Sequence, residues 1–172
     1  MIEPFAERWN RKWSACGFED IGTEMVVCGS DVLPDSAAPC LSFDRAARPA
    51  PIWEVFGIPS QWSQAERERL APYRMIGSDG AGNPLCVEQG IGSVALLDHE
   101  DRFRTRQFMN SSVRQLAECM LAYMGERDPE QFRAAVRSID AAALADQSFW
   151  WHEAAGLGAY QAADRESKDG RG

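Results

Sequence analysis

Short apolar segments bounded by turn-forming residues occupy the middle of the chain. The stretches between them are rich in Gly, Asn and Asp, which tolerate the positive φ angles of tight turns. Short strands joined by tight turns form an antiparallel meander, because parallel strands need long crossover connections. The sequence therefore predicts four antiparallel strands, at Tyr73–Ile76, Leu85–Glu88, Ser93–Leu97 and Arg106–Met109.

From residue 113 the apolar positions follow a helical period instead. They recur at intervals of three and four residues, which places them on one face of a helix that ends at Gly125. Asn110 or Ser111 is a suitable N-cap for this helix. The predicted buried face consists of Val113, Leu116, Ala117, Met120, Leu121 and Met124.

Two further helical segments follow. Asp128 is a good N-cap and Pro129 suits the first helical position, so a helix that buries Phe132 should begin there. The last helical segment is predicted over residues 141–162. The polar residues 164–172 are expected to form a disordered tail.

The N-terminal region shows a third amphipathic pattern. Phe5, Trp9 and Trp13 recur every four residues, which predicts a helix over Pro4–Cys16. A short strand is predicted at Met25–Cys28.

The segment that leads into the meander contains two predicted elements. Ile52–Ile58 is rich in aromatic and aliphatic residues and is interpreted as a weak strand. Ser63 and Glu66 have the spacing of a capping box, so a short helix should run from there to about Leu70.

The order of these elements defines the expected architecture. A helix, then strands, then helices packed on one face of the sheet make an α+β fold with a mainly antiparallel sheet flanked by helices. The length of 172 residues suits one domain. We place that domain at residues 1–163.

Composition and charge restrict the partners. Hydrophobic residues make up 45% of the chain, as in globular domains. The net charge of −8 disfavours binding to nucleic acid or to anionic membranes, both of which need clustered Lys and Arg. No apolar segment resembling a signal peptide or a membrane span is recognised, so a cytoplasmic location is expected.

The five cysteines show no spacing typical of a metal or redox site. No Cys-x-x-Cys pair is present, and buried free thiols in a reducing compartment are expected. No metal or cofactor is predicted. The cysteines are Cys16, Cys28, Cys40, Cys86 and Cys119.

The most suggestive charge pattern is an acidic segment near the N-terminus. Residues 17–44 contain six carboxylates and no Lys or Arg. Such a segment can be a solvated loop, or it can be a docking face that steers a basic partner. The candidate partner-binding residues are Glu19, Asp20, Glu24, Asp31, Asp35 and Asp44.

Several motifs resemble chemical sites but have simpler interpretations. Residues 90–95 match the pattern G-x-G-x-x-A, yet a dinucleotide site would need a helix where a strand is predicted, which favours a hairpin turn. The loop at residues 98–101 groups an imidazole with three carboxylates and is interpreted as solvated. Asp79 and Asn83 lack the spacing of a calcium-binding loop and fit a turn.

The two histidines leave an enzymatic alternative open. Nucleophilic or acid–base catalysis through an imidazole would have to use His99 or His152 with nearby carboxylates. This alternative is a small hydrolase-type enzyme, but no catalytic residue is assigned.

Five short motifs follow one another along the chain from Tyr73 onward. They are Tyr73-Arg-Met-Ile-Gly77, Asp79-Gly80, Pro84-Leu-Cys-Val-Glu88, Gly92-Ser-Val-Ala-Leu-Leu97 and Phe108-Met-Asn-Ser-Ser112, and Ser138-Ile-Asp140, Leu144 and Trp150-Trp151 follow in the later part. In this order the motifs resemble the SUKH superfamily, and within it the fourth group of SUKH immunity proteins. The resemblance is good over Tyr73–Tyr123, looser toward the C-terminus, and weak over the first 70 residues.

The resemblance implies a function as well as a fold. It implies an α+β domain that acts in a bacterial polymorphic-toxin system by binding and neutralising a cognate toxin, often a nuclease. It carries over no catalytic residue. A regulatory scaffold for an endogenous protein is the other binding role that such a domain could have.

Overall fold

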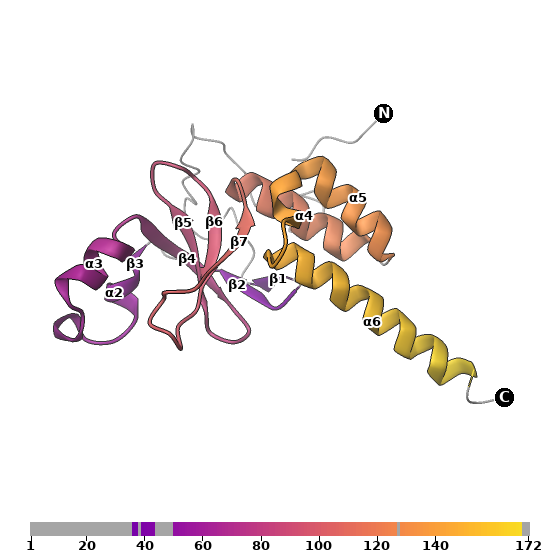
Figure 1. Ribbon diagram of the computed structural model, residues 1–172, viewed down its shortest axis with the longest axis horizontal. Helices are drawn as coiled ribbons and strands as arrows, with labels where there is room; N and C mark the ends of the chain where they lie inside the picture. Colours follow the sequence, from indigo (N-terminus) through magenta and orange to yellow (C-terminus); the bar gives the residue numbers. More distant parts are fainter. Residues whose placement is uncertain (1–35, 38, 44–49, 127, 170–172) are drawn as a thin grey trace.

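The computed structural model describes residues 36–37, 39–43, 50–126 and 128–169 (Figure 1). The predicted helix at Pro4–Cys16 and the predicted strand at Met25–Cys28 lie outside the described residues.

One antiparallel sheet forms the centre of the molecule. Seven strands of this sheet lie within the described residues; they follow the order β1-β2-β4-β5-β6-β7, and β3 also pairs with β4. Neighbouring strands are antiparallel throughout, so the predicted meander is confirmed. The strands are β1 (Ser36–Ala37), β2 (Leu41–Phe43), β3 (Ala50–Pro51), β4 (Tyr73–Asp79), β5 (Pro84–Glu88), β6 (Val94–Leu97) and β7 (Arg106–Asn110).

A layer of helices covers one face of this sheet (Figure 1). The predicted helices after residue 110 are confirmed, and Val113, Leu116 and Phe132 are buried. The last helix extends to Asp169, within the segment expected to be a tail. The elements of this layer are α4 (Val113–Gly125), α5 (Pro129–Ile139), the 3-10 helix η3 (Ala141–Leu144) and α6 (Phe149–Asp169).

A smaller cap covers the opposite face, so helices flank the sheet on both faces rather than packing on one. The cap consists of α2 (Ile52–Val55), the 3-10 helix η2 (Pro59–Gln61) and α3 (Gln64–Leu70). It packs Ile52, Trp62 and Leu70 against the sheet in a second hydrophobic core. The predicted capping box of α3 is confirmed, because Ser63 and Glu66 bond to each other's backbone N–H groups.

The predicted strand at Ile52–Ile58 is also wrong. The pairing of β3 with β4 ends at Pro51, and the chain then turns into α2, where the Phe56 N–H donates to the Ile52 carbonyl at 2.9 Å. One helical turn brings Ile52 and Phe56 to the same side, where both join the second core. The local apolar pattern suited either element, and packing under the sheet decided between them.

Burial on both faces explains the continuous apolar sequences of the central strands. Along β5, Leu85 and Val87 point into the helical layer, whereas Cys86 points into the cap. A strand with one solvated face would alternate apolar and polar residues instead. The expected α+β class with a mainly antiparallel sheet is confirmed.

Gly77 in β4 has a clear structural reason. A Cβ atom at this position would lie 2.1 Å from the Ser42 carbonyl oxygen of the neighbouring strand β2. Only glycine permits this close approach of two backbones. The register between β4 and β5 also shifts between Met75 and Gly77.

Among the described helices, none combines the length and the apolar character needed to span a membrane.

Candidate functional site

The six acidic residues proposed as a docking face cannot be placed in the fold. Glu19, Asp20, Glu24, Asp31, Asp35 and Asp44 all lie outside the described residues. The candidate site that follows consists of described residues alone.

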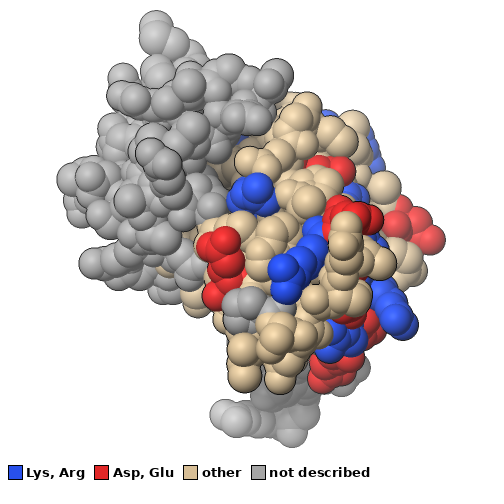
Figure 2. Space-filling view, turned by 90° about the vertical axis from the view of Figure 1, so that its left-hand side faces the viewer, with Lys and Arg blue, Asp and Glu red and all other residues tan. Residues whose placement is uncertain are grey.

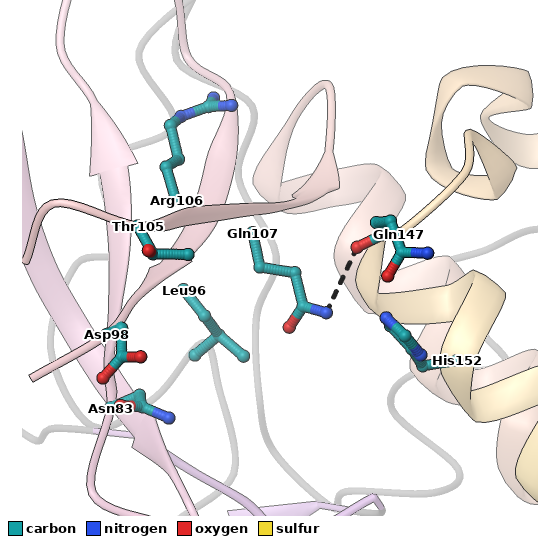
Figure 3. A pocket seen from close by; sticks show the side chains of 8 residues that line it. All are labelled: Asn83, Leu96, Asp98, Thr105, Arg106, Gln107, Gln147 and His152. Atoms are coloured by element: carbon teal, nitrogen blue, oxygen red, sulfur yellow. Dashed lines mark hydrogen bonds between the residues drawn. The ribbon is translucent and has the colours of Figure 1, made fainter. Parts of the chain in front are cut away.

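A polar groove lies between the sheet and the start of α6 (Figure 3). Its volume is about 330 Å³. One wall comes from the sheet and its β6–β7 loop, and the other from the residues around the start of α6. The groove is lined by Asn83, Leu96, Asp98, Thr105, Arg106, Gln107, Gln147 and His152.

The β6–β7 loop, residues 98–105, is held by its own hydrogen bonds. The Asp98 N–H donates to the Thr105 carbonyl at 3.0 Å, and the Phe103 N–H donates to the Asp98 carbonyl at 2.7 Å. The Asp101 carboxylate accepts from the backbone N–H groups of Arg104 and Thr105. The hydrogen bond from the Thr105 side chain lowers the pKa of Asp101. The loop therefore presents its groove-lining side chains from a fixed backbone.

The far side of the same loop is attached to the cap. Arg102 donates from Nε to Glu66 Oε1 at 2.6 Å, and its guanidinium lies 4.9 Å from the centre of the Trp62 ring. Arg69 donates to the carbonyl oxygens of both Arg102 and Phe103. Arg102 and Phe103 have φ angles of 61°, a conformation that costs energy in non-glycine residues and persists only where contacts hold it. These contacts fix the loop between cap and sheet.

The opposite wall of the groove is formed where the chain enters α6. Gln147 also has a positive φ, of 64°. Its carbonyl oxygen accepts from Gln107 Nε2 of β7 at 3.3 Å (Figure 3). The Trp151 ring lies edge-on to the His152 ring, with centroids 4.9 Å apart, and 38% of Trp151 is exposed. An exposed tryptophan thus lies beside a residue that lines the groove.

A buried polar network lies under the start of α6 and fixes its position. Asn110 at the end of β7 is fully buried; it accepts from Trp150 Nε1 at 2.7 Å and donates to Asp140 Oδ2 at 3.3 Å. Ser111 donates to the same carboxylate through its N–H and its hydroxyl. The motifs Asn-Ser-Ser, Ser-Ile-Asp and Trp-Trp of the sequence therefore meet in one cluster.

This network also corrects the predicted cap of α4. Asn110 and Ser111, the two expected caps, are both bonded to Asp140. The cap is Ser112, whose hydroxyl accepts from the Gln115 N–H at 3.2 Å. Propensity alone does not distinguish neighbouring Asn and Ser residues at a helix start.

The rings of both histidines contact neighbouring side chains of the fold. His99 Nδ1 lies 2.9 Å from Asn83 Oδ1, which also accepts from the His99 N–H. His152 packs against Trp151. Within the described part of the chain, neither ring hydrogen-bonds to a carboxylate, a hydroxyl or a thiol, and no group of three potential metal ligands is found there.

Three cysteines belong to the described residues, and they differ in exposure. Cys86 and Cys119 are buried free thiols, as expected. Burial raises the pKa of Cys119 to about 12, so this thiol is not nucleophilic near neutral pH. Cys40 is exposed, contrary to expectation, because it lies in the β1–β2 turn with a φ of 53°.

A second hollow lies on the surface of the cap and is lined in part by Trp53 and Trp62. Basic and acidic side chains are interspersed on this side of the molecule (Figure 2). Gln64 and Glu68 at the hollow bond to each other at 2.9 Å. Mixed charge gives no preference for a partner of either sign, so the groove beside α6 is the better candidate.

Sequence reasoning identified the groove only in part. The sequence singles out Asp98, Asn83 and His152 individually for other chemistry, whereas Gln107 and Gln147 carry no signal. The two walls are separated by about forty residues of sequence, and no local pattern predicts that they meet.

Comparison with known proteins gives one finding. A family model described as SUKH-4 immunity protein matches residues 32–157, which is more than two thirds of the chain and includes the whole groove. No curated protein and no solved structure matches the chain.

Proposed function

The chain belongs to the SUKH-4 immunity protein family, and from this premise we propose that it binds and neutralises a cognate bacterial toxin by protein–protein interaction. The family match over residues 32–157 carries the proposal. Immunity by binding requires a surface of fixed shape, and the loop at 98–105, bonded to itself and to the cap, supplies one.

We further propose that the chain is not an enzyme. Two groups near the groove that could take part in catalysis, His99 and Asp101, are engaged in hydrogen bonds of the fold. His99 bonds to the Asn83 amide oxygen, and the Thr105 side chain bonds to Asp101. A general base needs a hydrogen-bonded nucleophile or a substrate proton within reach. Because the hydrogen bonds of His99 and Asp101 hold the surface in shape, they support a binding role for these residues.

Charge supports a basic partner. The net charge is −8, and residues 17–44 contribute −6 of it. A toxin that acts on nucleic acid has a basic cleft for phosphates, and an acidic protein complements that charge. We propose a cytoplasmic encounter with such a toxin, in which Glu19, Asp20, Glu24, Asp31, Asp35 and Asp44 steer association, and in which neither nucleic acid nor a membrane is a partner.

The test uses the toxin encoded by the gene next to the one for this chain. Expression of that toxin in a bacterial host should stop growth, and co-expression of this chain should restore it. With purified proteins, toxin activity should fall linearly with added chain and vanish at a fixed stoichiometric ratio.

Two outcomes would contradict the proposal. Progressive loss of toxin activity at a small fraction of one equivalent would indicate turnover, and His99→Ala and His152→Ala would then be the next variants. Full toxin activity in the presence of excess chain would leave a regulatory scaffold as the remaining binding role.

A further inference from the structure

Apart from the imidazole of His152, the groove beside α6 offers hydrogen-bond acceptors rather than donors. Asp98 Oδ1 accepts from the Glu100 N–H at 2.8 Å, whereas Asp98 Oδ2 accepts no bond from any described residue. The side-chain oxygens of Gln107 and Gln147 are also without a partner among the described residues. Gln107 Nε2 donates to the Gln147 carbonyl at 3.3 Å and Gln147 Nε2 donates to Asp146 at 3.4 Å, an orientation that leaves the two side-chain oxygens as acceptors.

The donors of Arg106 and Asn83, which also line the groove, are already engaged. Arg106 points away from it (Figure 3) and donates to Glu88 Oε2 at 3.2 Å and to Ser93 Oγ at 3.1 Å. Asn83 Nδ2 donates to Asp79 Oδ2 at 3.0 Å. With the charge of Arg106 paired outside the groove, Asp98 is the remaining charged residue of the lining when His152 is neutral.

We propose that this groove receives an arginine side chain of the toxin, an inference that rests on the proposed function. A guanidinium has five donors in a fixed plane and no acceptor, which complements several separate acceptors better than an ammonium does. Leu96 provides an apolar surface for the aliphatic part of the side chain. The volume of about 330 Å³ is at the lower limit of small-molecule pockets, as expected for a single side chain.

Two features beside the groove strengthen this assignment. The acceptor Asp98 belongs to the rigid loop described above, so little conformational entropy is lost on binding. Trp151 is exposed next to His152 and can pack on the partner around the inserted arginine. Tryptophan is enriched at the residues that dominate binding energy in protein interfaces.

The first experiment tests the groove without the toxin. N-acetyl-arginine amide is titrated into the protein at millimolar concentration while backbone amide resonances are recorded by NMR. N-acetyl-citrulline amide has the same shape without the charge. Saturable shifts at Asp98, Thr105, Gln107 and His152 are expected with arginine and not with citrulline.

Two variants test which carboxylate binds the arginine derivative. Asp98→Asn keeps the acceptor for the Glu100 N–H but removes the charge, and should abolish the arginine shifts. Glu130→Gln is the matched control, because Glu130 is an exposed carboxylate at the start of α5. Its neighbour Pro129 lies beside Gly158, which is far along α6 from the groove at the start of that helix. It should leave the shifts unchanged. Equal shifts with citrulline, unchanged shifts in Asp98→Asn, or no saturable shift would overturn the proposal.

The second experiment separates this inference from the proposed function. Binding of the neighbouring-gene toxin to wild type, Asp98→Asn and Glu130→Gln is measured by calorimetry. A loss of about tenfold or more is expected for Asp98→Asn alone, because a desolvated charge pair is broken. Equal binding by all three proteins would refute the arginine site and leave the immunity function standing. No binding by wild type would refute the immunity function, even if free arginine still occupied the groove.

Discussion

Replacing Asn110 with alanine should destabilise the fold far more than its size suggests. Asn110 is fully buried and accepts from the indole N–H of Trp150, which is itself fully buried. It also donates to Asp140 and to the Cys119 sulfur, at 3.3 and 3.4 Å. Alanine removes all three bonds at once and leaves the indole donor without a partner.

The expected cost follows from these contacts. A buried polar group left without its partner costs about 1–3 kcal/mol, and the cavity left by the carboxamide adds roughly 1 kcal/mol. A total of about 3 kcal/mol is a large part of the 5–15 kcal/mol by which domains of this kind are stable. The melting temperature should fall by roughly 6–12 °C. Asp140 keeps two bonds from Ser111, which limits the loss.

Urea unfolding, followed by tryptophan fluorescence and circular dichroism, measures the free energy of unfolding. Ser138→Ala is the control, because Ser138 is an exposed residue of α5 and its loss should change stability by less than about 0.5 kcal/mol. In a Trp150→Phe background the orphaned donor is absent, so Asn110→Ala should cost about 1 kcal/mol less there. A cost for Asn110→Ala no larger than that of the control, or strict additivity with Trp150→Phe, would refute the reasoning.

Three further predictions concern charge and reactivity. The hydrogen bond from Arg102 lowers the pKa of Glu66 to about 2. The stability that this carboxylate contributes is therefore complete above about pH 4.5 and is lost as the pH falls toward 2. The melting temperature of the Glu66→Gln variant should depend less on pH across that window than the melting temperature of the wild type. Brief alkylation with iodoacetamide, read by mass spectrometry, should modify exposed Cys40 and spare Cys119; equal modification would contradict the burial of Cys119. Changing Asp31 and Asp35 together to Lys should slow toxin association by stopped flow, with a smaller effect at high salt; an unchanged rate would exclude the acidic segment from steering.

The parts of this protein that the sequence alone determined are those with local causes. Tight turns and short apolar segments predicted the strands from Tyr73 to Met109, because turn chemistry and strand length are read over a few residues. The capping box at Ser63 and the apolar face of α4 were found for the same reason. The order of short motifs also identified the family, although it gave no reason for any single residue.

Tertiary structure alone decided everything that depends on contacts between distant segments. The residues of α2 could have formed a strand and became a helix because that conformation buries Ile52 under the sheet. Asn110 and Ser111 could have capped α4, but Asp140, which lies about thirty residues later, engages both of them. The groove exists only because packing of the start of α6 brings Gln147 beside Gln107, about forty residues earlier in the sequence. Pattern and propensity act over a few neighbouring residues, whereas a site made by two distant surfaces depends on how the whole chain packs.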